Sequence, residues 1–380
     1  MSTTESPEYL VSEAQLVLTE ARRQKSERTK DLGEAIQLAG KALALRVHEG
    51  FAWIAENTTI AKKVDLETGK TVQIYKGHTA PVTSLAFYEN LLVTGSWDKT
   101  IKVWDTTTKA QLSSTDAHSD FVKCLCVIPR LKLLVSGSSD KIVRFWDLSN
   151  PTTGIALPSM GSISSHTRPI SCIEGVAVSD TAGTVYTADS MGIIRVWDIV
   201  REGVEPPRWK ATLKTEMKHR TGVNELRLFG EHLWTASADE TAQLFVGLKS
   251  TATITHAVNV RCVLPLNDLN EPYVLTGSGD VIRVYDISTP AKPELLNEID
   301  AHWHDVTALQ LWIRPLAGKP ELAEPWVVST SLDGTVRKWR VADALNPQPR
   351  QPLPKKEKKK AGFEMTEDEE RELAELMDDD

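Results

Sequence analysis

The sequence predicts an all-β fold in which one repeated unit of short strands closes into a ring. Residues 77–105, GHTAPVTSLAFYENLLVTGSWDKTIKVWD, contain three strand-length runs that are rich in β-branched side chains and separated by turn-forming residues. Imperfect copies of this stretch recur along most of the chain, about every 40–45 residues. One copy cannot bury both faces of its strands, whereas stacked copies can, so the repeat predicts a closed array.

Four polar residue types recur at fixed spacing in the unit: a His after the first Gly, a Ser/Thr pair in the second strand, an Asp in the next turn, and a Trp. This pattern resembles the WD repeat. The resemblance implies a seven-bladed β-propeller, which would take roughly 280–315 residues of this chain. It also implies a hydrogen-bonded chain from Asp to His to Ser/Thr to the indole N–H, which serves stability before any chemistry.

The expected blades differ in how much of this chain they keep. Blade one has Val64-Asp65 in place of the Trp-Asp pair, and blade four has Met191 where the turn Asp is expected. Blade five has Phe245 in place of the Trp, and blade six has Tyr285 and is one residue short before it. The residues predicted to form the structural network are His78, Asp98, Trp104, His118, Asp140, Trp146, His166, Trp197, His219, Asp239, His256, Asp280, His302, Asp333 and Trp339.

The chain divides into an N-terminal extension with a helix (1–30), the propeller (31–345) and a tail (346–380). Residues 33–40 are expected to complete the last blade, because the chain after Trp339 turns Pro-rich and offers no fourth strand. Such pairing would close the ring by joining the N-terminal segment to the C-terminal repeat.

A capping-box pattern at Ser12-Glu13-Ala14-Gln15 predicts that the N-terminal helix starts there and runs to about Lys30. A narrow apolar stripe would follow one side of it. The helix is expected to pack on the propeller or to stay solvated, with partner binding as the alternative. The stripe consists of Leu10, Ala14, Val17, Leu18 and Ala21.

The repeat explains most of the residues that could otherwise suggest chemistry. Cys124, Cys172 and Cys262 each fall six residues after the repeat His, where Ser84 stands in blade two, so this position favours a small side chain. Glu225 takes the position in blade five. It is expected to pair with a nearby Arg such as Arg227, or to form a charged feature of the central channel.

No phosphate-binding glycine loop, nucleophile elbow, paired-carboxylate constellation or zinc-type Cys/His cluster stands out. The sequence therefore predicts no enzyme, no cofactor and no metal site. An active site at the mouth of the channel is the alternative, because a motif search does not find every such site. The polar, acidic start of the chain, the four Cys and the lack of an ~18-residue apolar run predict an intracellular protein, cytoplasmic or nuclear, without a membrane span.

The resemblance also implies a partner-binding face, built from residues just after the repeat His and just before the turn Asp. Aromatic and Arg side chains exposed together are typical of interaction hot spots. The alternative is that the aromatic side chains fold back on neighbouring blades. The candidate residues are Trp97, Phe121, Arg168, Arg220, Trp303 and His304.

The tail from residue 346 is Pro-rich, then basic, then acidic. KKEKKK at 355–360 carries a charge of +4, and residues 361–380 carry −9. The tail is expected to be disordered alone, with an acidic helix that presents Leu373, Leu376 and Met377 to a partner. The basic block is a nuclear-import signal, a phosphate contact or a solvated linker.

The predicted function is a non-catalytic scaffold, monomeric on its own, that binds other proteins as a subunit or adaptor of a larger intracellular complex. Because the propeller is nearly neutral, direct nucleic-acid binding is not expected of it. A ribosome-assembly or chromatin- or RNA-associated factor that uses the charged tail is the alternative, beside the enzyme.

Overall fold

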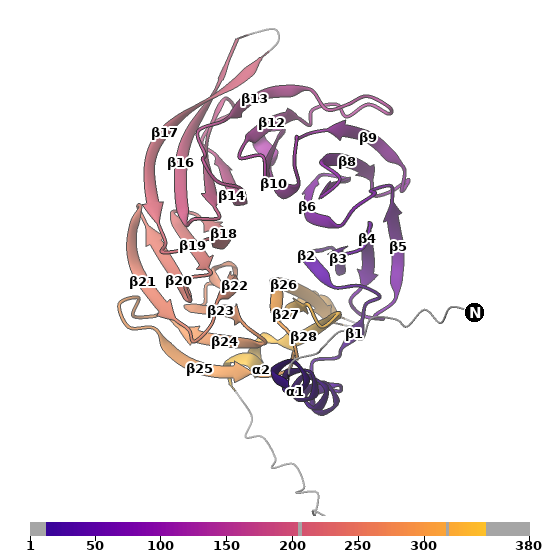
Figure 1. Ribbon diagram of the computed structural model, residues 1–380, viewed down its shortest axis with the longest axis vertical. Coiled ribbons are helices and arrows are strands. Elements are labelled where there is room, and N and C mark those ends of the chain that lie inside the picture. Colours follow the sequence, from indigo (N-terminus) through magenta and orange to yellow (C-terminus); the bar gives the residue numbers. More distant parts are fainter. Residues whose placement is uncertain (1–12, 204–206, 317–318, 347–380) are drawn as a thin grey trace, which may run out of the picture. The chain divides into compact units, whose positions relative to one another are not determined.

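The computed structural model describes residues 13–203, 207–316 and 319–346. These residues form seven antiparallel four-stranded sheets arranged as the blades of a propeller (Figure 1). The fold therefore confirms the predicted seven-bladed β-propeller with an N-terminal helix.

Each of the first six blades consists of four strands that are consecutive in the chain. The strand nearest the axis comes first, and the outermost strand comes last (Figure 1). The blades are β2–β5 (Ala42–His48, Phe51–Glu56, Ile60–Asp65, Thr71–Lys76), β6–β9 (Val82–Tyr88, Leu91–Ser96, Thr100–Asp105, Gln111–Asp116), β10–β13 (Val122–Ile128, Leu133–Ser138, Val143–Asp147, Ser159–Ile163), β14–β17 (Ile170–Ala177, Ala182–Asp189, Ile193–Glu202, Arg208–Lys218), β18–β21 (Val223–Phe229, His232–Ser237, Thr241–Val246, Lys249–Thr255) and β22–β25 (Val260–Pro265, Tyr273–Ser278, Val281–Asp286, Glu294–Ile299).

The seventh blade closes the ring with strands from both ends of the described chain. It contains β26 (Val306–Leu316), β27 (Lys319–Ser331) and β28 (Thr335–Arg340), and its outer strand is β1 (Ile36–Gln37). Ile36 pairs with Val336 across β1 and β28, and the Lys338 backbone N–H donates to the Gly33 carbonyl at 2.7 Å. The prediction that residues 33–40 complete the last blade is confirmed.

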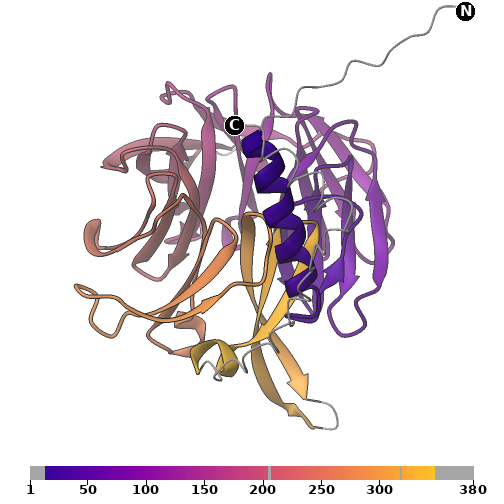
Figure 2. The same ribbon diagram turned by 60° about the horizontal axis from the view of Figure 1, so that its bottom comes forward.

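Helix α1 (Glu13–Thr29) lies beside the strands of the seventh blade (Figure 2). The apolar stripe does not make this contact, because Val17 and Leu18 are 64% and 50% exposed. Polar contacts at its C-terminal half hold the helix instead: Lys25 pairs with Asp280 and Asp300. Ser12, the expected cap, lies outside the described residues.

The C-terminal end of α1 is anchored by a buried charge. Arg337 of β28 is only 2% exposed and donates to the carbonyls of Thr29 and Leu32. A cation is favourable there because the carbonyls at the end of a helix lack intrahelical donors and carry partial negative charge. After β28, the chain ends its described part in the short helix α2 (Val341–Leu345).

The apolar core lies between blades rather than within them. One buried cluster, for example, joins Val135 and Phe145 of the third blade to Val185 and Ile199 of the fourth. Burial of this kind requires a neighbour on both sides, which explains why the ring must close. The short 3-10 helices Pro129–Leu131 and Asn267–Leu269 connect strands in the third and sixth blades.

Candidate functional site

The repeat His, Asp and Trp form one hydrogen-bonded chain in the second blade. His78 Nδ1 lies 2.7 Å from Asp98 Oδ2, and its Nε2 lies 2.7 Å from the Thr94 hydroxyl, which also accepts the Trp104 indole N–H at 2.9 Å. Burial alone would raise the pKa of Asp98, but the hydrogen bonds from His78 and Thr100 outweigh it and hold the pKa below its usual range.

The third, fifth and seventh blades repeat the His to Asp contact. The Nδ1 to Oδ2 distances are 2.9 Å for His118 and Asp140, 3.0 Å for His219 and Asp239, and 2.8 Å for His302 and Asp333. The indoles of Trp146 and Trp339 complete the chain in the third and seventh blades. These side chains are committed to the fold, which leaves them unavailable for chemistry.

The fourth blade reaches a similar result with an Asp at another position. Asp189 is fully buried two residues before Met191, and its Oδ2 lies 3.5 Å from His166 Nδ1. Arg195 donates to that same ring nitrogen at 2.9 Å, and His166 Nε2 contacts the Thr187 hydroxyl, which accepts the Trp197 indole N–H. The sequence prediction missed Asp189 because it expected the turn Asp only at the position that Met191 occupies.

The first blade replaces the network by a buried ion pair. The Glu56 side chain is completely buried, and its Oε1 lies 2.7 Å from Lys62 Nζ. Val64 occupies the position of the repeat Trp and lies in the apolar core. The blade therefore keeps a paired polar group without the His or the indole.

In the sixth blade the predicted network is wrong. Asp280 pairs with Lys25 of α1 at 2.7 Å, and both ring nitrogens of the buried His256 lack a hydrogen-bond partner. The turn between β23 and β24 holds only two residues, one fewer than in the second blade, so Asp280 is displaced from the histidine. Tyr285, which replaces the Trp, packs edge-on against His256 with ring centroids 5.7 Å apart.

Replacing His256 by Phe should stabilise the protein, because it removes a buried ring with two unsatisfied nitrogens. Burial, followed by the charge of Arg283, lowers the pKa of His256 from 6.5 to about 4. The unfolded chain therefore binds a proton more readily, and wild-type stability falls as the pH drops from 6.5 through 4. The advantage of His256→Phe should be roughly 2 kcal/mol larger at pH 5 than at pH 7, measured by urea unfolding.

The matched control is His219→Phe in the fifth blade, which leaves Asp239 and the Thr235 hydroxyl without their partner. This variant should lose about 2–4 kcal/mol at pH 7. Equal losses from both substitutions would contradict the broken network in the sixth blade.

One face of the ring carries the loops that lead into the innermost strands and the turns between second and third strands, and we call it the upper face. Loop and turn are joined within each blade, as in the hydrogen bond from Trp97 N–H to the Pro81 carbonyl at 3.0 Å. Trp97 and Phe121 stack on each other with ring centroids 5.1 Å apart and an angle of 19° between the ring planes. The pair bridges the second and third blades, and each side chain remains 38% exposed at the surface.

The other candidate contact residues lie around the same face but do not form one cluster with the aromatic pair. Arg168 and Arg220 are exposed in the loops before β14 and β18. Arg220 is fixed by a hydrogen bond from its guanidinium to the Asp239 carbonyl at 2.7 Å. Trp303 and His304 are half-buried in the loop before β26, where burial lowers the pKa of His304 and Arg22 adds to the effect.

The upper face is rich in exposed basic side chains. The repeat Asp residues of this face are bonded to the histidines as described above. Asp280 is paired with Lys25, and Asp305 is paired with Arg261. Among the described residues of this face, Asp116, Asp120 and Glu240 are acids without an ion pair. The exposed basic residues are Lys41, Lys99, Lys123, Lys141, Arg168 and Arg220. This face therefore favours a negatively charged ligand.

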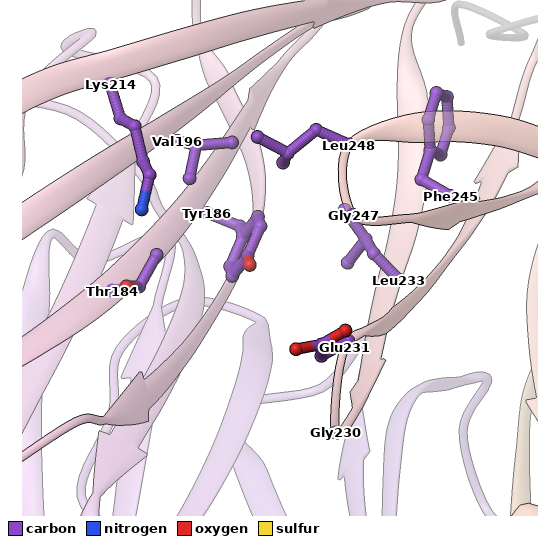
Figure 3. A pocket seen from close by; sticks show the side chains of 10 residues that line it. All are labelled: Thr184, Tyr186, Val196, Lys214, Gly230, Glu231, Leu233, Phe245, Gly247 and Leu248. Atoms are coloured by element: carbon purple, nitrogen blue, oxygen red, sulfur yellow. The ribbon is translucent and has the colours of Figure 1, made fainter.

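Three of the cavities in the described part of the ring are relevant to a binding site. The first, of about 310 Å³, lies at the upper mouth of the channel, where Trp97 is part of its lining together with Lys123 and Arg261. The second, of about 280 Å³, lies deeper in the channel. The third, also about 280 Å³, separates the fourth and fifth blades, with Tyr186 on one side and Leu233 and Glu231 on the other (Figure 3).

The cavity in Figure 3 follows from two changes in the fifth blade. Phe245 replaces the repeat Trp, and the connection from β20 to β21 is reduced to Gly247-Leu248, so less material fills the space between the blades. Its charged lining groups are the Glu231 carboxylate and the Lys214 ammonium group.

The cysteines and metal-binding residue types do not form a reactive site. Burial raises the pKa of the Cys124 thiol to about 12 and raises those of Cys172 and Cys262 well above the usual range. A Cβ on Gly277 would lie 2.5 Å from Cys262 Sγ, which shows why this position takes a small side chain. Within the described ranges, no group of three or more His, Cys, Asp or Glu residues is placed to hold a metal ion.

Sequence reasoning found two of the charged residues of the channel and missed two others. Glu225 pairs with Arg227 at 2.9 Å, as one of its two interpretations expected. Arg46 and Glu174 face the same part of the channel and were not singled out. A signal was present, since each occupies the same position in the innermost strand of its blade.

The tail residues Leu373, Leu376 and Met377 lie outside the described residues. Of the helices described, none has the length and apolar character needed to cross a membrane.

Comparison with known proteins gives consistent matches. The family model described as "WD domain, G-beta repeat" matches residues 69–105 and 109–147. An uncharacterized WD repeat-containing protein of Schizosaccharomyces pombe is 30% identical over 305 residues, which covers 76% of this chain and 74% of that protein. Mitochondrial division protein 1 of the same organism is 31% identical over 168 residues, covering 40% of this chain and 25% of that protein.

Two further similarities are narrower in what they show. A probable E3 ubiquitin ligase complex SCF subunit, sconB of Aspergillus clavatus, is 50% identical over 42 residues, only 11% of this chain and 6% of that protein. Among solved structures, the computationally designed Ika8 protein is similar with a TM-score of 0.58 and 26% identity, covering 79% of this chain and 83% of the designed one.

Proposed function

Because the chain belongs to the WD-repeat family, whose members generally act as protein-interaction scaffolds, we propose that it is a non-catalytic scaffold that binds a partner protein on its upper face. The bound segment is acidic and carries an apolar anchor. The observation that carries this proposal is the stacked pair of Trp97 and Phe121, exposed beside Lys99, Lys123 and Lys141.

The aromatic pair supplies the apolar half of the proposed site. Two large rings that are partly exposed and already held against each other lose little freedom on binding, so covering them gains apolar burial at low entropic cost. Such aromatic anchors typically dominate the binding energy of an interface.

The basic side chains orient the bound acidic segment and raise the rate at which it associates. The exposed Lys residues of the second and third blades lie beside the pair, and the exposed Arg residues of the fourth and fifth blades lie on the same face. The acids of this face are mostly paired. Complementary charge steers an acidic segment to the surface and is screened over ~8–10 Å at physiological salt. Binding should therefore weaken as salt rises.

The proposal that the chain is not an enzyme rests on what its polar residues already do. The buried His and Asp side chains of the ring are occupied by the repeat contacts or, for His256, held in an apolar surrounding. The likeness to the SCF subunit extends over about one repeat, so it supports family membership and not a role in ubiquitin transfer.

Replacing Trp97 and Phe121 together by Ala should lower partner recovery about tenfold or more, because two exposed hot-spot rings each contribute at least ~1 kcal/mol to binding. The stability of the variant should stay within about 1 kcal/mol of wild type, since both side chains are partly exposed. Quantitative affinity purification of the tagged full chain, followed by mass spectrometry and a melting curve, measures both effects.

The control is Val178→Ala with Phe229→Ala, which removes two exposed apolar side chains at the C-terminal ends of the innermost strands β14 and β18, on the face opposite the upper face. Unchanged recovery with the Trp97/Phe121 variant would rule out the upper face. If nuclease treatment, rather than these substitutions, abolished recovery, the basic side chains would serve nucleic acid and the protein-binding proposal would be wrong.

Three further assignments stay predictions. These are the division into 1–30, 31–345 and 346–380, the cytoplasmic or nuclear location, and the use of the charged tail for a second contact. Partner recovery with residues 346–380 removed would test the last of them.

A further inference from the structure

The innermost strands of all seven blades share one register. Each begins with a buried residue that pairs with the end of the second strand, such as Val82 with Ser96, and each then has a bulge. Because the register is shared, the residue four positions later occupies the same level of the channel in every blade. These residues are Arg46, Ala86, Cys126, Glu174, Arg227, Leu264 and Gln310.

Charged and apolar side chains at this level enclose one cavity of about 280 Å³. Arg46, Glu174 and Arg227 line it together with Cys126. The rest of its wall is apolar, from Ala86, Phe87, Leu125, Val127 and Ile173. Small-molecule sites also combine apolar side chains with a few converging polar groups.

The Arg227 guanidinium lies across the channel. From β18 of the fifth blade it donates to the Leu309 carbonyl of the seventh blade at 3.1 Å, and Gln310 lies within hydrogen-bond reach. Its charge is balanced by Glu225 at 2.9 Å, which also accepts the Val263 backbone N–H at 2.9 Å. The Arg227 Nε remains buried without a hydrogen-bond partner.

Arg46 and Glu174 are not balanced in this way. The Arg46 guanidinium donates to the Leu45 carbonyl at 3.3 Å, and no carboxylate of the described residues lies within 4.0 Å of it. Burial lowers the pKa of Arg46, and the nearby charge of Arg227 lowers it further; burial raises the pKa of Glu174. Arg46, Glu174 and the Arg227 Nε–H therefore keep unused hydrogen-bonding capacity at the cavity, and the charges of Arg227 and Arg46 act on Glu174 from nearby.

We propose that this cavity binds a small zwitterion of the α-amino acid class. Its carboxylate lies between Arg46 and Arg227, its ammonium group faces Glu174, and an apolar side chain packs on Phe87, Leu125 and Ile173. A simple anion fits less well, because the Glu174 carboxylate would repel it. A zwitterion satisfies all three charged groups at once.

The test is isothermal titration calorimetry of the full chain with L-alanine, L-leucine, L-methionine and L-phenylalanine at millimolar concentration. At least one should bind. For the one that binds best, the amide that lacks the carboxylate and the acid that lacks the ammonium group should each bind at least about tenfold more weakly.

Two variants of nearly unchanged shape locate the site. Arg46→Met should abolish discrimination against the amide, and Glu174→Gln should abolish discrimination against the deaminated acid. The matched control is Lys123→Met, which removes a cation from the upper channel mouth and not from this cavity, and should leave binding unchanged. Melting curves confirm that each variant is folded.

The proposal is overturned if none of the four amino acids binds, or if the amide and the acid bind as well as the amino acid. Equal loss of binding in Lys123→Met would also overturn it. Should Arg46→Met fail to fold, the comparison of the three ligand forms on the wild-type protein still decides the question.

Discussion

Deleting residues 1–40 should lower the melting temperature of the protein by about 5 °C or more. The deletion removes β1 and α1, and it leaves the almost completely buried Arg337 without the carbonyls of Thr29 and Leu32. A buried charge that loses its partners typically costs about 3–5 kcal/mol, to which the lost strand pairing adds. In a protein of this size each kcal/mol corresponds to about 1–2 °C. Differential scanning calorimetry measures the change.

Two further proteins make this result specific. Deletion of residues 1–12 preserves every described contact and should melt like the full chain. Gly33→Val should reproduce part of the loss, because Gly33 has φ +67° and a Cβ there would collide with the Trp339 ring. A 1–40 deletion that melts at the wild-type temperature would contradict closure of the ring by β1.

Asp333→Ala should be the most damaging single substitution in the repeat network, with an expected loss of about 3–5 kcal/mol. The carboxylate accepts hydrogen bonds from His302 at 2.8 Å, from the Thr335 N–H at 2.9 Å and from the Thr335 hydroxyl at 2.7 Å. Removing it leaves several buried donors unsatisfied in the blade that also closes the ring. Chemical denaturation followed by Trp fluorescence measures the loss.

Asp280→Ala is the matched control, since Asp280 stands at the corresponding turn of the sixth blade. Its side chain is 42% exposed and pairs with Lys25, so its removal should cost no more than about 1 kcal/mol. Similar losses from the two substitutions would show that the two blades use their Asp in the same way, against the geometry described above.

The network and the binding surface compete for the same part of each repeat. Turn and loop residues that enter the network, such as Asp98, are held in place, and their charged groups are hydrogen-bonded within the blade. The residues beside them, such as Trp97, are left at the surface on a rigid support. This arrangement lets the exposed positions change their chemistry without loss of the fold, which suits a scaffold.

The sequence alone determined the repeat architecture of this protein. The spacing of His78, Asp98 and Trp104, and of their copies, predicted seven blades and the closing role of residues 33–40. Such predictions succeed because period-two strands and a buried polar chain constrain residue types locally, within one repeat of the chain.

Only the tertiary structure decided what the imperfect repeats do and which groups meet across the ring. A turn shortened by one residue separates His256 from Asp280, and the latter pairs with Lys25, which is 255 residues away in the sequence. Arg46, Glu174 and Arg227 face one cavity because three different blades bring them to the same level of the channel. Contacts of this kind depend on how blades are placed around a closed ring, and the spacing within a single repeat contains no information about that placement.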